Sequence, residues 1–111
     1  HRMADGAANP YLVAAAALHA ARFRVEHQMS APVPQTPGEP PNTERRVPPT
    51  LEAGLGAFEA DDQLCGAFGP WLVETFTKLK RAEWERYAKT VGDATTTEVT
   101  PWELDYYLPF F

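Results

Sequence analysis

Few residues of this 111-residue chain have a type and position suited to chemistry. Near its start, Arg2 precedes the turn-forming stretch Asp5–Ala8 and a helix-start signal at Asn9 and Pro10. An arginine at the end of a strand could project into a cleft, where its planar guanidinium would bind a carboxylate or a phosphate. Since most arginines are solvated surface residues, this position by itself makes Arg2 a weak candidate for an anion contact.

Two pairs of acidic residues lie close together in sequence, at Asp61–Asp62 and at Glu83 and Glu85. At the start of a helix, the two aspartates are best interpreted as a cap that also complements the helix dipole. Glu83 falls on an apolar helix face, three residues after Lys80. We favour a half-buried ion pair, with the lysine stem lying along apolar surface. The alternative is a polar contact from Glu83 to another part of a larger protein.

The histidines and the cysteine form no recognisable catalytic or metal-binding pattern. His19 and His27 are eight residues apart, and no cysteine or carboxylate lies at ligand spacing from both. Cys65 has no basic neighbour in sequence, so we expect a small buried apolar residue. The sequence also lacks a glycine-rich phosphate loop and a nucleophile elbow. These residues therefore supply no predicted metal ligand or nucleophile.

The elements that carry these residues are predicted to be mainly helical. Asn9 and Pro10 start a helix that runs to about His27 and is apolar on every side down to Ala21, as buried helices are. Four later helices are predicted: Leu51 to Ala60 after a Thr50 cap, Asp61 or Asp62 to Phe68, Pro70 to Val91, and Pro101 to Leu108 after a Thr100 capping box. The first helix needs more partners than these elements supply, so we expect a larger surrounding domain.

The predicted helix from Pro70 to Val91 is the longest. Its outer side carries two favourable charge pairs four residues apart, Glu74 with Lys78 and Glu85 with Lys89. An apolar stripe on the other side is formed by Leu72, Val73, Phe76, Leu79, Trp84, Tyr87 and Val91. This pattern is typical of a helix that packs one face against neighbouring elements.

Residues 28–49 differ from the rest of the chain because seven of them are proline. This composition predicts an extended surface loop stiffened by proline, without a helix. Its length is unusual for a compact domain, so it is either a mobile excursion or a strap across a neighbour.

The net charge of −5 argues against non-specific binding to nucleic acid or an anionic membrane. With one cysteine, an intrachain disulfide is impossible, and a reducing, cytoplasmic setting is the default. The alanine-rich first helix is too short for a membrane span, and no signal peptide is visible. The chain begins at His1 without an initiator methionine, and we therefore expect a truncation whose natural start lies upstream.

Four stretches, in the expected order and spanning nearly the whole chain, resemble the C-terminal end of the glutamine synthetase catalytic domain. They are Arg2–Leu12, Val47–Asp61 (matching at Val47–Leu51 and Ala57–Asp61), Lys80–Tyr87 and Val99–Leu108 (matching at Val99–Leu104 and Tyr107–Leu108). The last two look more like the branch with gamma-glutamylpolyamine synthetases than like the housekeeping enzyme. The resemblance implies that residues 1–111 are a mainly α, C-terminal helical segment of an α+β catalytic domain, with only a strand end at the N-terminus.

The resemblance also implies an ATP-dependent ligase that forms gamma-glutamyl phosphate from glutamate and ATP. Ammonia or an amine then displaces the phosphate, with Mg²⁺ or Mn²⁺ present and the subunits arranged in a homo-oligomeric ring. Arg2 matches the family's arginine that contacts glutamate and the transferring phosphate. The metal and nucleotide ligands would lie upstream of His1, so the chain alone is not expected to be active. It departs from the family pattern at Arg22–Val25, in place of a glycine-containing helix end, and in the proline-rich loop.

A second interpretation is a non-catalytic helical interaction module. In this case the proline-rich loop at residues 28–49 and the C-terminal aromatic residues would bind a partner. A monomeric chain that melts cooperatively would favour this alternative, whereas a molten or aggregating chain would favour a fragment of a larger domain.

Overall fold

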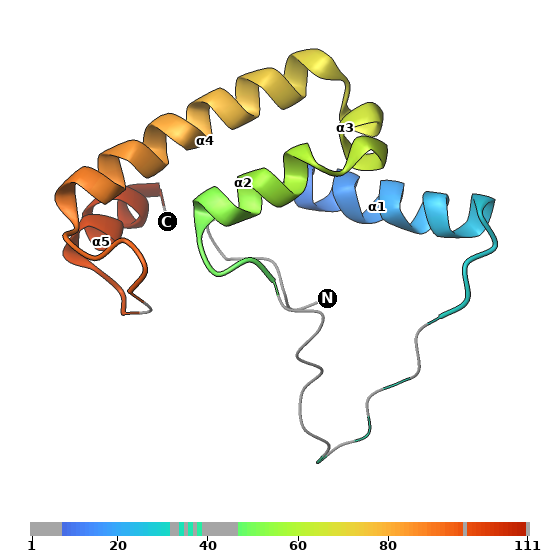
Figure 1. Ribbon diagram of the computed structural model, residues 1–111, viewed down its shortest axis with the longest axis horizontal. Coiled ribbons are helices and arrows are strands. Elements are labelled where there is room, and N and C mark those ends of the chain that lie inside the picture. The colour runs from blue at the N-terminus through green and yellow to red at the C-terminus, as the bar shows by residue number, and fades with distance from the viewer. Residues whose placement is uncertain are drawn as a thin grey trace. The chain divides into compact units, whose positions relative to one another are not determined.

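The computed structural model describes residues 8–31, 34, 36, 38, 47–96 and 98–110. They form five α-helices and a final 3₁₀ turn, with no strand in the described ranges, which confirms the mainly α prediction (Figure 1). The expected strand end and Arg2 lie outside the described residues. Among the described helices, none is long and apolar enough to cross a membrane. The chain divides into two compact units, residues 1–47 and 48–111, which are described separately.

In the first unit, helix α1 (Pro10–Glu26) begins as the sequence predicts. The Asn9 side chain accepts hydrogen bonds from the backbone N–H groups of Tyr11 and Leu12, at 3.0 and 3.2 Å. The helix continues through the stretch where the family pattern has a glycine-containing end. Near its C-terminus, Arg22 Nε donates to Glu26 Oε1 at 2.7 Å on the exposed surface, one turn further on.

No residue of α1 is buried, although the sequence predicts a buried helix. Tyr11, Leu18 and Val25 are largely exposed. The apolar residues of α1 are spread around its axis, so burying them would require cover on several sides. The described residues of the first unit do not supply that cover.

In the second unit, three consecutive helices pack together: α2 (Leu51–Glu59), α3 (Asp62–Phe68) and the long α4 (Pro70–Thr90) (Figure 1). The Thr50 hydroxyl accepts from the Ala53 N–H at 3.2 Å, and the Asp61 carboxylate accepts from the Leu64 N–H at 2.9 Å. Both predicted caps are therefore present, and Asp61 rather than Asp62 is the cap of α3. Between α3 and α4, Gly69 has a φ of 81°, which a residue with a side chain rarely adopts.

The core of this unit is small. Leu55 of α2 is only 3% exposed, and the ring of Phe58 packs edge-on against Phe68 and Phe76, with ring centroids 6.2 and 5.9 Å away. Leu79 was expected in the apolar stripe of α4 but is 65% exposed, because no described element of the second unit covers its side of the helix.

The two predicted charge pairs on α4, Glu74 with Lys78 and Glu85 with Lys89, do not form ion pairs in the structure. All four side chains are exposed, and water competes with such contacts. Instead, Arg81 forms an ion pair with Glu59, which joins α4 to α2.

The last helix, α5 (Pro101–Tyr107), runs into the 3₁₀ turn Leu108–Phe110. Its predicted capping box is confirmed. The Thr100 hydroxyl accepts from the Glu103 N–H at 3.3 Å, and Glu103 Oε2 accepts from the Thr100 N–H at 2.7 Å. The reciprocal bonds satisfy two backbone donors at the helix start, and so fix where α5 begins.

Candidate functional site

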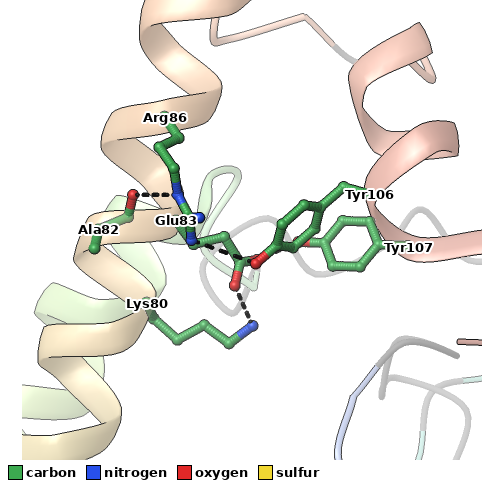
Figure 2. Close-up of polar contacts among 6 residues, drawn as sticks. All are labelled: Lys80, Ala82, Glu83, Arg86, Tyr106 and Tyr107. Atoms are coloured by element: carbon green, nitrogen blue, oxygen red, sulfur yellow. Dashed lines mark hydrogen bonds and ion pairs between the residues drawn. The ribbon is translucent and has the colours of Figure 1, made fainter. Parts of the chain in front are cut away.

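The carboxylate of Glu83 is the centre of a polar cluster between α4 and α5. Only 6% of the residue is exposed. Lys80 Nζ lies 2.7 Å from Glu83 Oε2, and the Tyr107 hydroxyl donates to Glu83 Oε1 (Figure 2). The favoured interpretation of a Lys80–Glu83 pair is confirmed, although Glu83 is more deeply buried than expected.

Burying a carboxylate is costly unless its oxygens are paired and hydrogen-bonded. Both oxygens of Glu83 have such a partner, one cationic and one neutral. Desolvation raises the pKa of the Tyr107 phenol, and the hydrogen bond to the nearby Glu83 carboxylate raises it further. Tyr107 therefore stays protonated, as a donor to Glu83, well beyond neutral pH.

Aromatic rings surround this polar cluster and hold α5 against α4. Tyr87 packs edge-on against Trp102 and lies beside Trp84, with ring centroids 5.4 and 5.6 Å away. Trp102 stacks on Tyr106 at 4.6 Å. The Arg86 guanidinium lies 5.6 Å from the centre of the Tyr106 ring, within the range of a cation–π contact (Figure 2).

An open pocket of about 150 Å³ lies next to the cluster. Two carboxylates, Glu83 and Glu103, and the rings of Trp84, Tyr87, Trp102 and Tyr107 form part of its lining, together with residues 49–51, Ala94 and Thr96. All of these residues belong to the second unit. The pocket therefore combines aromatic surface with negative charge.

Sequence reasoning missed Tyr107 and the pocket. Tyr107 follows Glu83 by 24 positions, and no periodicity relates residues on two separate helices. The available signal was indirect: Glu83 and Tyr107 lie in two of the stretches that carry the family resemblance. A buried carboxylate needs a second donor, and the phenol of Tyr107 provides it.

The other candidate residues have simple structural roles. The half-buried Cys65 thiol donates to the Phe58 carbonyl at 3.1 Å. Desolvation raises its pKa, as do the neighbouring acidic residues Asp61, Asp62 and Glu59. Among the described residues, no group of three or more histidine, cysteine or acidic side chains could hold a metal ion. Arg2, the one predicted catalytic contact, lies outside the described ranges.

Three of the stretches that resemble the glutamine synthetase family make direct contacts in the second unit. Glu59, from the stretch Val47–Asp61, pairs with Arg81 of the stretch Lys80–Tyr87. Glu83, in the same stretch, binds Tyr107 of the stretch Val99–Leu108. These three motifs are therefore parts of one packed unit.

Comparison with known proteins agrees with this structure. Residues 1–107 match the family described as "glutamine synthetase, catalytic domain". A glutamine synthetase of Methanocaldococcus jannaschii is 32% identical, over 96% of this chain and 24% of its own length. The glutamate–methylamine ligase of Methyloversatilis universalis is 30% identical, over 99% of this chain and 25% of its own length.

A glutamine synthetase of Staphylococcus aureus is also 30% identical, over 96% of this chain and 24% of its own length. The chain thus spans about a quarter of the length of these relatives. No solved structure matches it. The family match covers residues of both units, including α1, the Glu83 cluster and all of α5. The chain therefore belongs to the glutamine synthetase catalytic-domain family.

Proposed function

We propose that this chain is the C-terminal part, residues 1–111, of the catalytic domain of an ATP-dependent glutamate–ammonia or glutamate–amine ligase. The observation that carries the proposal is the family match over residues 1–107. Relatives named glutamine synthetase and glutamate–methylamine ligase support it. The reaction would proceed through gamma-glutamyl phosphate, in the cytoplasm, in a homo-oligomeric ring.

In this proposal, Arg2 contacts the glutamate substrate and the transferring phosphate. A guanidinium suits this role because its fork of donors matches the oxygens of both groups and it stays charged. The helices of the second unit would form part of the outer wall of the catalytic domain. Since α5 is tied to α4 through Glu83 and Tyr107, α5 would be held as part of that wall.

ATP and Mg²⁺ or Mn²⁺ would be held by residues outside this chain. The described residues do not fit a metal site, because they contain no group of three or more potential ligands. Bound divalent cations would neutralise charge on the transferring phosphoryl group. We assign no metal ligand or nucleotide contact to this chain.

A trapping assay tests the proposed reaction on the native-length protein. Hydroxylamine replaces the amine, because it converts an acyl phosphate into a stable hydroxamate. With glutamate, ATP and Mg²⁺, we expect gamma-glutamyl hydroxamate, and with ammonia or methylamine we expect phosphate release that depends on glutamate. Comparing the two acceptors identifies the amine. Absence of glutamate-dependent phosphate release would contradict the ligase and favour the non-catalytic interaction module.

The Arg2→Ala variant tests the assigned contact. Removing an arginine that stabilises transferring charge should lower kcat/KM on the order of 100-fold, with little change in the melting temperature. Arg22→Ala is the matched control, because Arg22 is an exposed arginine of α1 that pairs with Glu26. It should retain activity within about twofold. Near-normal turnover of Arg2→Ala would remove Arg2 from the proposal and leave the ligase assignment standing.

A further inference from the structure

The pocket beside Glu83 has a composition that the proposed reaction does not use. Its aromatic lining includes Trp84, Tyr87 and Trp102, whose ring faces carry negative electrostatic potential. Two carboxylates, Glu83 and Glu103, line the same space. An anion would be repelled by these carboxylates, and a neutral apolar ligand would offer no positive charge to Glu103.

The two carboxylates differ in their cationic and hydrogen-bonding partners. Glu83 is neutralised by Lys80 and accepts from Tyr107. Glu103 uses one oxygen, Oε2, which accepts from the Thr100 backbone N–H and hydroxyl at 2.7 and 2.8 Å. Its other oxygen accepts no hydrogen bond from the described residues, and no described lysine or arginine pairs with it.

The pocket therefore carries, next to its aromatic rings, one carboxylate that no described lysine or arginine neutralises. Of the basic residues on α4, Lys80 is paired with Glu83, and Arg86 contacts the Tyr106 ring and the Ala82 carbonyl (Figure 2). A metal ion is a poor match, since the described residues contain no cluster of three or more ligands. An organic cation satisfies both features, because it is attracted to ring faces and to a carboxylate together.

We propose that the pocket lined by Trp84, Tyr87, Trp102, Glu83 and Glu103 binds a small organic ammonium ion. A volume of about 150 Å³ has room for an ammonium group with methyl substituents. The aromatic rings contact the substituents, and the Glu103 carboxylate faces the positive charge. This inference rests on the pocket alone and is independent of the ligase assignment.

Isothermal titration calorimetry on the native-length protein tests the proposal with choline as the probe. Its neutral isostere, 3,3-dimethylbutan-1-ol, has the same shape without the charge. We expect saturable binding of choline with a dissociation constant of about 0.1–10 mM, and binding of the alcohol at least about tenfold weaker. Equal binding of the two compounds, or no saturable heat with choline, would overturn the proposal. If a lysine from another segment of the native-length protein already occupied the pocket, choline would give no saturable heat, and the proposal would be overturned.

The Glu103→Gln variant tests the carboxylate without removing the helix cap, since glutamine also serves at this position of a capping box. We expect it to weaken choline binding about tenfold at constant ionic strength. The control is Glu98→Gln, which removes the same charge from an exposed residue that does not line the pocket. Unchanged affinity in Glu103→Gln would overturn the proposal. If that variant loses its helical circular dichroism, the comparison of choline with its isostere in the unaltered protein decides.

Discussion

At the scale of single residues, Glu83 shows how a buried charge is tolerated. Its position on an apolar face, three residues after Lys80, was enough to predict the ion pair, because residues three apart on a helix are neighbours. Its second partner, Tyr107, could not be predicted. That contact depends on how α5 packs against α4, which no local pattern encodes.

Tyr107→Phe removes the hydroxyl and leaves Glu83 Oε1 buried without its donor. We expect a loss of about 1.5–3 kcal/mol in unfolding free energy, typical of a hydrogen bond to a charged group. Urea unfolding of the native-length protein measures it. Tyr106→Phe is the control, since the Tyr106 hydroxyl has only a 3.4 Å contact with Arg86, and it should cost less than about 0.5 kcal/mol. Equal losses would show that the Glu83 contact contributes no specific stability.

The same tyrosine predicts how stability depends on alkaline pH. Folding raises the pKa of Tyr107 above its ordinary value of 10.0, so the folded protein binds more protons than the unfolded chain above that pH. The contribution of Tyr107 to stability is therefore complete below pH 10.0 and is lost as the pH rises further. Unfolding curves recorded from pH 9 upward should show this loss in the unaltered protein and in Tyr106→Phe. The Tyr107→Phe variant should lack it, and an identical slope there would contradict the assignment.

At the scale of elements, the helices were largely predictable because their starts are encoded locally. Asn9, Thr50 and Thr100 cap the helices that they were predicted to cap, and Asp61 is the one of the two predicted alternatives that caps α3. The sequence could not predict which element packs against each helix face. Leu79 belongs to a helical stripe by spacing, yet it is exposed, since burial depends on the element opposite and not on periodicity.

Gly69 connects α3 to α4 with φ 81° and ψ 156°, a conformation that glycine alone adopts readily. A Cβ added there would meet no atom within 4 Å, so Gly69→Ala tests backbone strain without a clash. We expect a loss of about 1–3 kcal/mol in unfolding free energy. Gly56→Ala in α2 is the matched control, because its added Cβ also meets nothing and alanine favours a helix; it should gain about 0.5–1 kcal/mol. Equal effects of the two substitutions would show that the turn at Gly69 carries no strain.

At the scale of the whole molecule, the described residues carry abundant apolar surface and bury little of it. Among the described residues, the buried hydrophobic residues are Leu55 and Tyr87. Large apolar side chains remain exposed in both units, among them Leu18 of α1 and Trp71 of α4. The apolar character of α1 was visible in the sequence, but the surface that covers it was not, because burial depends on the element that packs opposite and not on composition.

This imbalance predicts how the isolated 111-residue chain will unfold. A small core exposes little new surface on unfolding, so the denaturant dependence should be shallow and the thermal transition broad. Uncovered apolar surface should also bind the dye ANS and promote self-association. Circular dichroism, ANS fluorescence and light scattering, each compared with the native-length protein, measure these properties. A monomeric chain with a sharp, cooperative transition and no ANS binding would contradict the fragment interpretation. That result would require a self-sufficient helical module whose exposed apolar residues serve a partner instead of the remainder of a catalytic domain.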